Sequence, residues 1–159
     1  MSFTHLDAAG HARMVDVTEK QPTVRSATAR GFVRVAPETA AALRDGSVPK
    51  GDVLAVARIA GIQGAKKCAE LLPLAHVIGV HGAVVDLAVE DRGVAIEATV
   101  RTADRTGVEM EALTAVTVAA LSVVDMVKGM DRSAAIENAR IVAKTGGRSG
   151  SWTREEESS

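Results

Sequence analysis

The pattern of hydrophobic and polar positions along the chain predicts four strands. Apolar residues alternate with polar ones over residues 83–89 and again over residues 94–101, which is the period of a half-buried strand. Asp91-Arg92-Gly93 separates the two stretches and is a hairpin turn signal. A β-rich stretch at residues 24–35 precedes them, and residues 136–144 provide the last strand.

Three helices are predicted between these strands. Pro37 opens a short helix, because proline suits the first helical turn and the acidic residue behind it favours a helix N-terminus. Asp52 caps a second helix that runs to about Leu72, where Pro73 stops it. The third helix runs over residues 106–130, and its apolar positions step by three and four residues: Leu113, Val116, Ala120, Val123 and Val127.

The order strand, helices, strand, strand, helix, strand predicts an α+β fold of the ferredoxin-like βαββαβ type. It predicts an antiparallel sheet with the helices on one face, and an apolar second face would invite a partner. We expect a flexible N-terminal arm at residues 1–12, a single ferredoxin-like domain at residues 13–147 and a polar C-terminal tail at residues 148–159.

The composition indicates association between subunits. The 159 residues fit one domain, and a hydrophobic content of 47% makes a packed core feasible. Aromatic residues are only 2%, and alanine and valine dominate the apolar set. Small side chains bury little area each, so we expect the core of one subunit to be shallow. Association with identical subunits would bury more apolar surface, and we therefore expect an oligomer.

Charge and cysteine content exclude several classes of protein. The chain has 19 Lys and Arg against 20 Asp and Glu, and this balance supports neither nucleic-acid binding nor disorder. Cys68 is the only cysteine, which excludes an intrachain disulfide and a cysteine-rich metal site. We expect no signal peptide, and Asp125 interrupts the most apolar stretch, residues 113–127, so that no membrane span is expected either. A cytoplasmic protein is the expectation.

The lysines are the first candidate catalytic residues, because only six are present against thirteen arginines. Lysine shifts its pKa readily enough for acid–base work and also binds phosphate as a point charge, although a solvated surface role is the simpler alternative. Asp125 and Lys128 lie at i and i+3, hence on one helix face, in an otherwise apolar segment. We expect this face to be partly buried. A buried Asp–Lys pair is a candidate acid–base couple, and the alternative is an ordinary surface ion pair.

Glu109, Met110 and Glu111 fall in the first turn of the same helix. The helix dipole alone explains acidic residues there. Glu111 precedes Asp125 by fourteen residues, which is about 21 Å along the helix axis at 1.5 Å per residue. Two residues so far apart do not serve one small-molecule centre within a single subunit. If both are functional, sites completed by neighbouring chains become attractive.

Two further segments carry candidate groups. His76 follows the predicted second helix, and a lone histidine is more often structural than catalytic; the four histidines show no metal-binding spacing. The Gly-rich segment at residues 144–150 carries Lys144 and Arg148, and backbone N–H groups of such a turn can hold a phosphate. It lacks the Walker spacing, and a flexible tail is the alternative. Gly61 and Gly64 lie inside a predicted helix rather than at its start, so we reject that segment as a phosphate loop.

Several blocks of the sequence resemble the MoaC family. They are MVDV at 14–17, TVR at 23–25, KGDV at 50–53, ARIAGIQ at 57–63, GVEMEALTA at 107–115, DMVK at 125–128 and KTGGRSG at 144–150. The match runs in order from about residue 4 to residue 150 without a large gap.

The resemblance implies a lyase of molybdenum cofactor (molybdopterin) biosynthesis. The implied reaction converts 3′,8-cyclo-7,8-dihydroguanosine 5′-triphosphate, a GTP-derived small molecule, into cyclic pyranopterin monophosphate and pyrophosphate. The resemblance also implies ferredoxin-like subunits assembled as a homohexamer, a trimer of dimers, with active sites at subunit contacts. It implies no required cofactor, and it leaves open whether Mg²⁺ accompanies the substrate phosphates. Neither a nucleic-acid nor a membrane partner is expected.

The matching motifs carry the family's site residues onto this chain. Asp125 and Lys128 would form the central acid–base pair, with three further catalytic residues around the substrate: Lys50, His76 and Lys144. Substrate-binding residues would be Leu74, Ala75, His76, Glu109, Met110 and Glu111 around the base, and Arg25 near the phosphates. The chain departs from the family where Leu-Cys-His-Pro becomes Leu74-Ala75-His76-Val77. That change puts the rigidity of this loop and the level of activity in question.

Two other readings compete with the enzyme. A catalytically weakened paralogue would bind the nucleotide intermediate or a partner protein without turnover, and the departure around His76 motivates it. The retained Asp125, Lys128, Lys50 and Lys144 argue against it, because a binding module does not need an acid–base pair. A purely structural oligomer leaves the lysines unexplained. The enzyme should release pyrophosphate, whereas a binding module should take up the purine triphosphate and release none.

Overall fold

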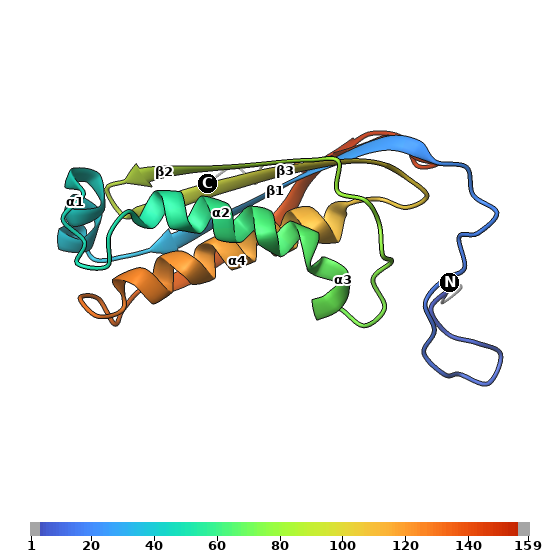
Figure 1. Ribbon diagram of the computed structural model, residues 1–159, viewed down its shortest axis with the longest axis horizontal. Coiled ribbons are helices and arrows are strands. Elements are labelled where there is room, and N and C mark those ends of the chain that lie inside the picture. The colour runs from blue at the N-terminus through green and yellow to red at the C-terminus, as the bar shows by residue number, and fades with distance from the viewer. Residues whose placement is uncertain (1–3, 156–159) are drawn as a thin grey trace.

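Five strands form one antiparallel sheet, which Figure 1 shows above the helices. The structure is a computed structural model that describes residues 4–155. The strands are β1 (Thr23–Arg34), β2 (Gly82–Glu90), β3 (Gly93–Asp104), β4 (Ala135–Thr145) and β5 (Trp152–Thr153), in the spatial order β2-β3-β1-β4-β5. The four long strands are the predicted ones, and every pair in the sheet is antiparallel, as predicted.

The four helices within the described residues lie on one side of the sheet or at its end, which confirms the α+β prediction (Figure 1). They are α1 (Pro37–Asp45), α2 (Val53–Lys66), α3 (Cys68–Leu71) and α4 (Glu109–Val127). α2 packs on β2, α4 packs on β1, β3 and β4, and the two helices pack side by side. The strand face toward the helices holds small residues such as Ala27, Ala29 and Val33, and the largest fully buried side chain is Ile96.

Two helix boundaries differ from the prediction. The second helix does not run to Leu72, because Lys67 leaves helical geometry with φ −101 and ψ 7, and α3 then starts at Cys68. The third helix begins at Glu109 and ends at Val127, inside the predicted span of 106–130, because glycines at 107 and 129 weaken both ends. β5 was not predicted, since two residues carry no detectable strand period.

The helices α2 and α4 approach closely at two glycines of α2. A Cβ atom on Gly61 would lie 2.9 Å from the carbonyl oxygen of Ala115, and one on Gly64 would lie 2.9 Å from the Val118 side chain. The missing side chains therefore let the two helix backbones pack together. This contact fixes where the residues before α2 lie relative to the end of α4.

α4 is the helix of the described residues that is long and apolar enough to cross a membrane by length and composition. More than half of its most apolar window, 56%, is buried inside the protein. It packs against three strands and α2, so it is a core helix of the fold.

Candidate active site

One group of charged residues gathers where α4 ends. The Lys128 ammonium donates to the Asp125 Oδ1 atom at 2.6 Å, and the Lys50 ammonium lies 3.6 Å from Oδ2. Lys50 also donates to the Asp125 backbone carbonyl at 3.0 Å. The hydrogen bond from Lys128 is the main cause that holds the pKa of Asp125 below its ordinary value, and the charge of Lys50 adds to it. The carboxylate is therefore ionised at neutral pH between two lysines.

Local backbone structure explains this grouping, which we call the lysine cluster: Lys50, Asp125 and Lys128. Gly51, with φ +101, turns the chain directly after Lys50, and the Asp52 side chain then caps α2 by accepting from the Ala55 N–H. Asp125 lies in the last turn of α4, and Lys128 follows at its C-cap, where the helix dipole favours a cation. The α2–α4 packing brings the two segments together.

The prediction that the Asp125–Lys128 face is partly buried is wrong for the subunit. Their side chains are 56% and 60% exposed. α4 buries the stripe that contains Val116, Ala120 and Val123, whereas Asp125 lies on the opposite side, in line with the exposed Leu121. The apolar neighbours of Asp125 in sequence thus face the sheet, and Asp125 does not.

A second group lies at the other end of α4. The Lys144 ammonium is 3.4 Å from the Glu109 carboxylate and donates to the Ser149 hydroxyl at 2.7 Å. Both charged side chains are mostly covered, at 27% and 29% exposure. Lys144 is thereby held by groups from two segments, the start of α4 and the loop after β4.

Glu111 is the buried acid of this second group. It is 5% exposed, and burial is the main cause that raises its pKa above the ordinary value. A hydrogen bond with Cys68 of α3 and the nearby His76 act in the opposite direction. The Thr114 hydroxyl in turn donates to the Cys68 sulfur at 3.5 Å. The break at Lys67 is what turns α3 so that Cys68 reaches α4.

An apolar pocket of about 620 Å³ adjoins these polar groups. It is lined by Ala12, Leu72, Pro73, Leu74, Ala75 and Met110. Met110 is 42% exposed and Leu74 is 40% exposed, so the pocket is accessible in the subunit. Its walls suit the flat apolar faces of a heterocyclic base, and Glu111 adds a polar group beside Met110 in the sequence.

His76 and Arg25 are fixed by backbone segments. The His76 Nε2 atom is hydrogen-bonded to the Val15 carbonyl. Arg25 donates to the Thr23 hydroxyl at 3.0 Å, and its guanidinium lies where a Cβ on Gly147 would be. Gly146 and Gly147 both have positive φ, so the turn after Lys144 packs directly on Arg25. We call Arg25, His76, Glu109, Glu111 and Lys144, with the pocket, the glutamate cluster.

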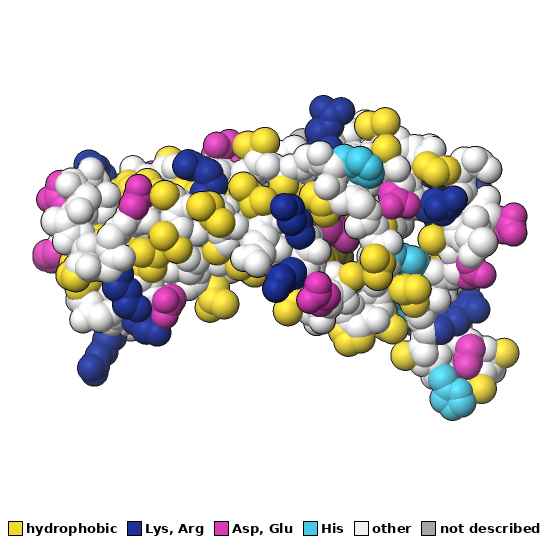
Figure 2. All heavy atoms as spheres, in the orientation of Figure 1, with side chains coloured by type: hydrophobic (Ala, Val, Ile, Leu, Met, Phe, Trp, Pro, Cys, Tyr) yellow, Lys and Arg dark blue, Asp and Glu magenta, His cyan; other side chains and the backbone are white. Residues whose placement is uncertain are grey.

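The structure does not bring the two clusters together within one subunit. Asp125 and Glu111 lie on the same continuous helix, fourteen residues apart, which is about 21 Å along its axis. The sequence-derived separation of the candidate residues is therefore confirmed. Figure 2 shows hydrophobic side chains scattered over the helix side of the molecule. On α2 and α4, exposed hydrophobic residues at positions between the two ends are Val56, Ile59 and Leu121.

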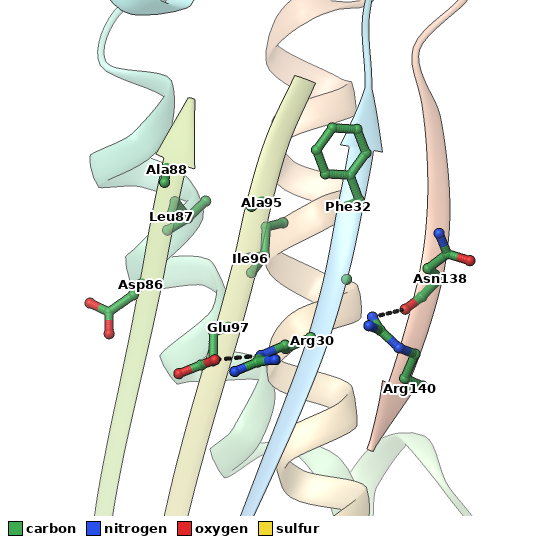
Figure 3. Close-up of a pocket in the computed structure, with 11 residues that line it drawn as sticks. Arg30, Phe32, Asp86, Leu87, Ala88, Ala95, Ile96, Glu97, Asn138 and Arg140 are labelled. Carbon is green, nitrogen blue, oxygen red and sulfur yellow. Dashed lines mark hydrogen bonds and ion pairs between the residues drawn. The ribbon is translucent and has the colours of Figure 1, made fainter. Parts of the chain in front are cut away.

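The sheet face away from the helices is charged rather than apolar. Arg30 pairs with Glu97 at 2.6 Å, Arg34 pairs with Glu137 at 2.6 Å, and Thr28 and Thr99 share a hydrogen bond of 2.9 Å. Figure 3 shows a hollow of about 510 Å³ on this face, with Phe32 and the Arg30–Glu97 pair along it. No candidate site residue lines it.

Sequence reasoning missed the groups that support the candidate residues. These are Cys68 and Thr114 behind Glu111, Ser149 on Lys144, and the Val15 carbonyl on His76. Ser149 belongs to the Gly-rich segment and could have been proposed from it. The other contacts join segments far apart in sequence and carry no local signal. Within residues 4–155, no group of three His, Cys, Asp or Glu side chains gathers as a metal site.

The fold and the two clusters define an α+β protein with groups of charged side chains at both ends of one helix. The MoaC family model matches residues 14–147. A cyclic pyranopterin monophosphate synthase of Streptomyces coelicolor is 61% identical over 152 residues, which cover 96% of this chain and 89% of that protein. Synthases of the same name from Chloroflexus aurantiacus and Thermomicrobium roseum are 56% and 54% identical, over 96% and 98% of this chain and 94% and 95% of theirs. The chain belongs to the MoaC family.

Proposed function

We propose that this chain is a lyase of molybdenum cofactor biosynthesis that makes cyclic pyranopterin monophosphate. Its substrate is the 3′,8-cyclised, GTP-derived triphosphate, and pyrophosphate is the second product. The observation that carries the proposal is the Asp125 carboxylate between two lysine ammonium groups, in a chain 61% identical to a synthase of that name.

The lysine cluster supplies the proton transfers. Opening a purine-derived ring and closing a cyclic phosphate both need protons moved at defined atoms, and neither step is a redox reaction. Lys128 is the proton donor and acceptor in this proposal, because its ammonium already donates a hydrogen bond to the Asp125 carboxylate at 2.6 Å. Lys50 stabilises the negative charge of the phosphates as they approach.

The glutamate cluster binds the substrate. The apolar pocket at Leu74, Ala75 and Met110 takes the base, and Glu111 bonds its polar edge. Lys144, His76 and Arg25 surround the ribose and phosphate part. The packing of Arg25 on the Gly146–Gly147 turn supports this role, since it places a guanidinium beside the Gly-rich turn that follows Lys144.

A complete site needs both clusters, so we propose that two subunits share it. A two-fold axis through the exposed apolar side chains of α2 and α4 would set the two α4 helices antiparallel. The lysine cluster of one subunit would then meet the glutamate cluster of its partner, twice per dimer. Val56, Ile59 and Leu121 support this arrangement, because their exposed side chains lie between the two clusters.

The proposed assembly is a hexamer, a trimer of dimers, of ferredoxin-like subunits. The charged sheet face supports a second type of contact, since its paired arginines and glutamates can re-pair with those of another copy. We propose a reaction that requires no resident cofactor and takes place in the cytoplasm. Mg²⁺ enters only with the substrate phosphates, and removing it with a chelator should raise KM without abolishing kcat.

The deciding experiment measures pyrophosphate released by the purified protein from the cyclised GTP intermediate. Release by the wild type and none by Lys128→Ala would support the synthase and place Lys128 in the chemistry. Binding of the intermediate without any release would contradict it. The protein would then be the weakened paralogue. The altered loop at Ala75 and Val77 is the reason for considering it, and Val77 is 88% exposed. Ala75→Cys combined with Val77→Pro would then show whether the altered loop or a missing catalytic group causes the lack of turnover.

A further inference from the structure

The N-terminal segment lies against the proposed substrate site. His76 hydrogen-bonds the Val15 carbonyl, and Ala12 lines the apolar pocket together with Met110 and Leu74. Figure 1 shows this part of the chain passing beside the loop that follows α3. We call residues 12–17 the strap.

The strap contact assigns the proton on His76. A carbonyl oxygen only accepts hydrogen bonds, so the Nε2 atom that faces Val15 must carry the hydrogen. In the neutral ring the Nδ1 atom is then the proton acceptor. Within residues 4–155 that Nδ1 atom makes no hydrogen bond, so it remains able to accept one from a substrate.

Backbone contacts are present at both ends of the strap. Before it, the backbone N–H of Arg13 donates to the His5 carbonyl at 2.8 Å, and Leu6 and Ala12 form a β-bridge. After it, the Arg105 guanidinium donates to the Lys20 carbonyl at 3.0 Å. The segment after the strap is thus attached at Lys20 to the loop between β3 and α4, four residues before Glu109.

We propose that the strap is a positioning element of the active site. The Val15 carbonyl holds the His76 ring in one orientation with the proton on Nε2, and Ala12 closes one wall of the base pocket. Nδ1 of His76 is then the atom that accepts a hydrogen bond or proton from the substrate. The catalytic consequence rests on the proposed function, but the hydrogen bond and the tautomer do not.

The first test is ¹⁵N NMR of the histidine side chains in the full chain, with His76→Gln to assign the signal. We expect an Nε2-bound proton on His76 that exchanges slowly with water. Deletion of residues 1–17 should make that proton exchange too fast to observe, and Arg105→Ala should speed its exchange. Arg101→Ala, which changes an exposed arginine of β3 four residues before Arg105, is the matched control and should change nothing. A proton on Nδ1, or the same exchange with and without the strap, overturns the proposal.

The second test is steady-state kinetics of pyrophosphate release. We expect the deletion to lower kcat/KM about 10- to 100-fold, because a misplaced reacting group costs on that order. In the His76→Gln background the same deletion should cost less, since the part that acts through His76 is already lost and only the missing pocket wall at Ala12 remains. Equal losses in both backgrounds would contradict a positioning role. Arg105→Ala, which removes no backbone, should give a smaller loss of the same kind and replaces the deletion if that variant does not fold. If the wild type itself releases no pyrophosphate, the proposed function fails, and the NMR result still decides the strap.

Discussion

At the scale of single residues, the pKa of Asp125 in the proposed acid–base pair is set by neighbouring charges rather than by burial. Asp125 and Lys128 are exposed in the subunit, yet the carboxyl pKa is lowered because two lysines face it. An exposed ion pair contributes little to stability. The pair is therefore free to exchange protons with a substrate without loosening the fold.

Lys128→Ala should fold and assemble but lose turnover. We expect a decrease in kcat of at least about 100-fold, which is the usual contribution of one acid–base group, with an unchanged melting temperature. Arg44→Ala is the control, because it removes an exposed ion pair of 3.2 Å with Asp91, outside both clusters. Unfolding of the Lys128 variant would instead make this residue structural.

The buried carboxyl of Asp131 should make the free energy of unfolding depend on pH. Its buried carboxylate accepts from the Ala36 N–H at 2.7 Å, which is the main cause that lowers its pKa, and from Ser133. A carboxyl with a lowered pKa stabilises the folded state above its ordinary value of 3.8, and this stabilisation disappears as the pH falls through the folded value. Asp131→Ala should therefore cost about 2 kcal/mol at pH 7 and clearly less well below pH 3.8, where the part that belongs to the ionised carboxylate is lost. Urea unfolding at both pH values measures it. Asp91 has a side chain that is 97% exposed, and Asp91→Ala should cost nothing at either pH. A cost of Asp131→Ala that is the same at both pH values would refute this explanation.

The sequence allowed the candidate residues to be named but not their surroundings. Spacing along one helix already separates Glu111 from Asp125, because a helix has a fixed rise per residue. The predicted burial of Asp125 was wrong, since residues that are apolar and adjacent in sequence need not lie on the same helix face. The contacts of His76 with Val15 and of Glu111 with Cys68 depend on tertiary packing, which no local pattern encodes.

At the scale of elements, the local sequence located the four long strands and the main helices. Alternation marked β2 and β3, the spacing by three and four residues marked α4, and proline and cap residues marked α1 and α2. The local sequence located neither the break at Lys67 nor β5. The break is imposed by packing of Cys68 under α4. β5 consists of Trp152 and Thr153, which pair with Lys144 and Ala143 of β4. Two residues carry no strand pattern of their own, so β5 depends on this pairing.

Gly61→Ala tests the contact between α2 and α4. A Cβ there would meet a backbone carbonyl oxygen at 2.9 Å and the Ala119 Cβ at 3.1 Å, so the helices must separate. We expect a loss of about 1–3 kcal/mol despite the better helix propensity of alanine, together with reduced activity, because Lys50 would move away from Asp125. Gly129→Ala, with no atom within 4 Å of the added Cβ, should leave the stability unchanged. Thermal unfolding of both variants is the measurement. Wild-type stability and turnover in Gly61→Ala would show that the close approach of these helices is not required.

At the scale of the whole molecule, the proposed site is divided between subunits. Lys128→Ala and Lys144→Ala should each be inactive alone. Unfolding and refolding them together should restore about a quarter of the wild-type activity, because half of the mixed dimers are heterodimers and each of these has one intact site. The readout is pyrophosphate release against the fraction of each variant in the mixture. A site built within one subunit would give no recovery at any ratio.

Helix α4 also sets the spacing between the two clusters, and this limits how its length can change. Its 19 residues fix both the distance and the angle between the lysine cluster and the glutamate cluster. One inserted residue would shift one cluster by about 1.5 Å and rotate it by about 100° relative to the other. In a symmetric dimer that error would occur at both sites at once. Substitutions on α4 can therefore accumulate over evolutionary time, whereas changes in its length should be eliminated.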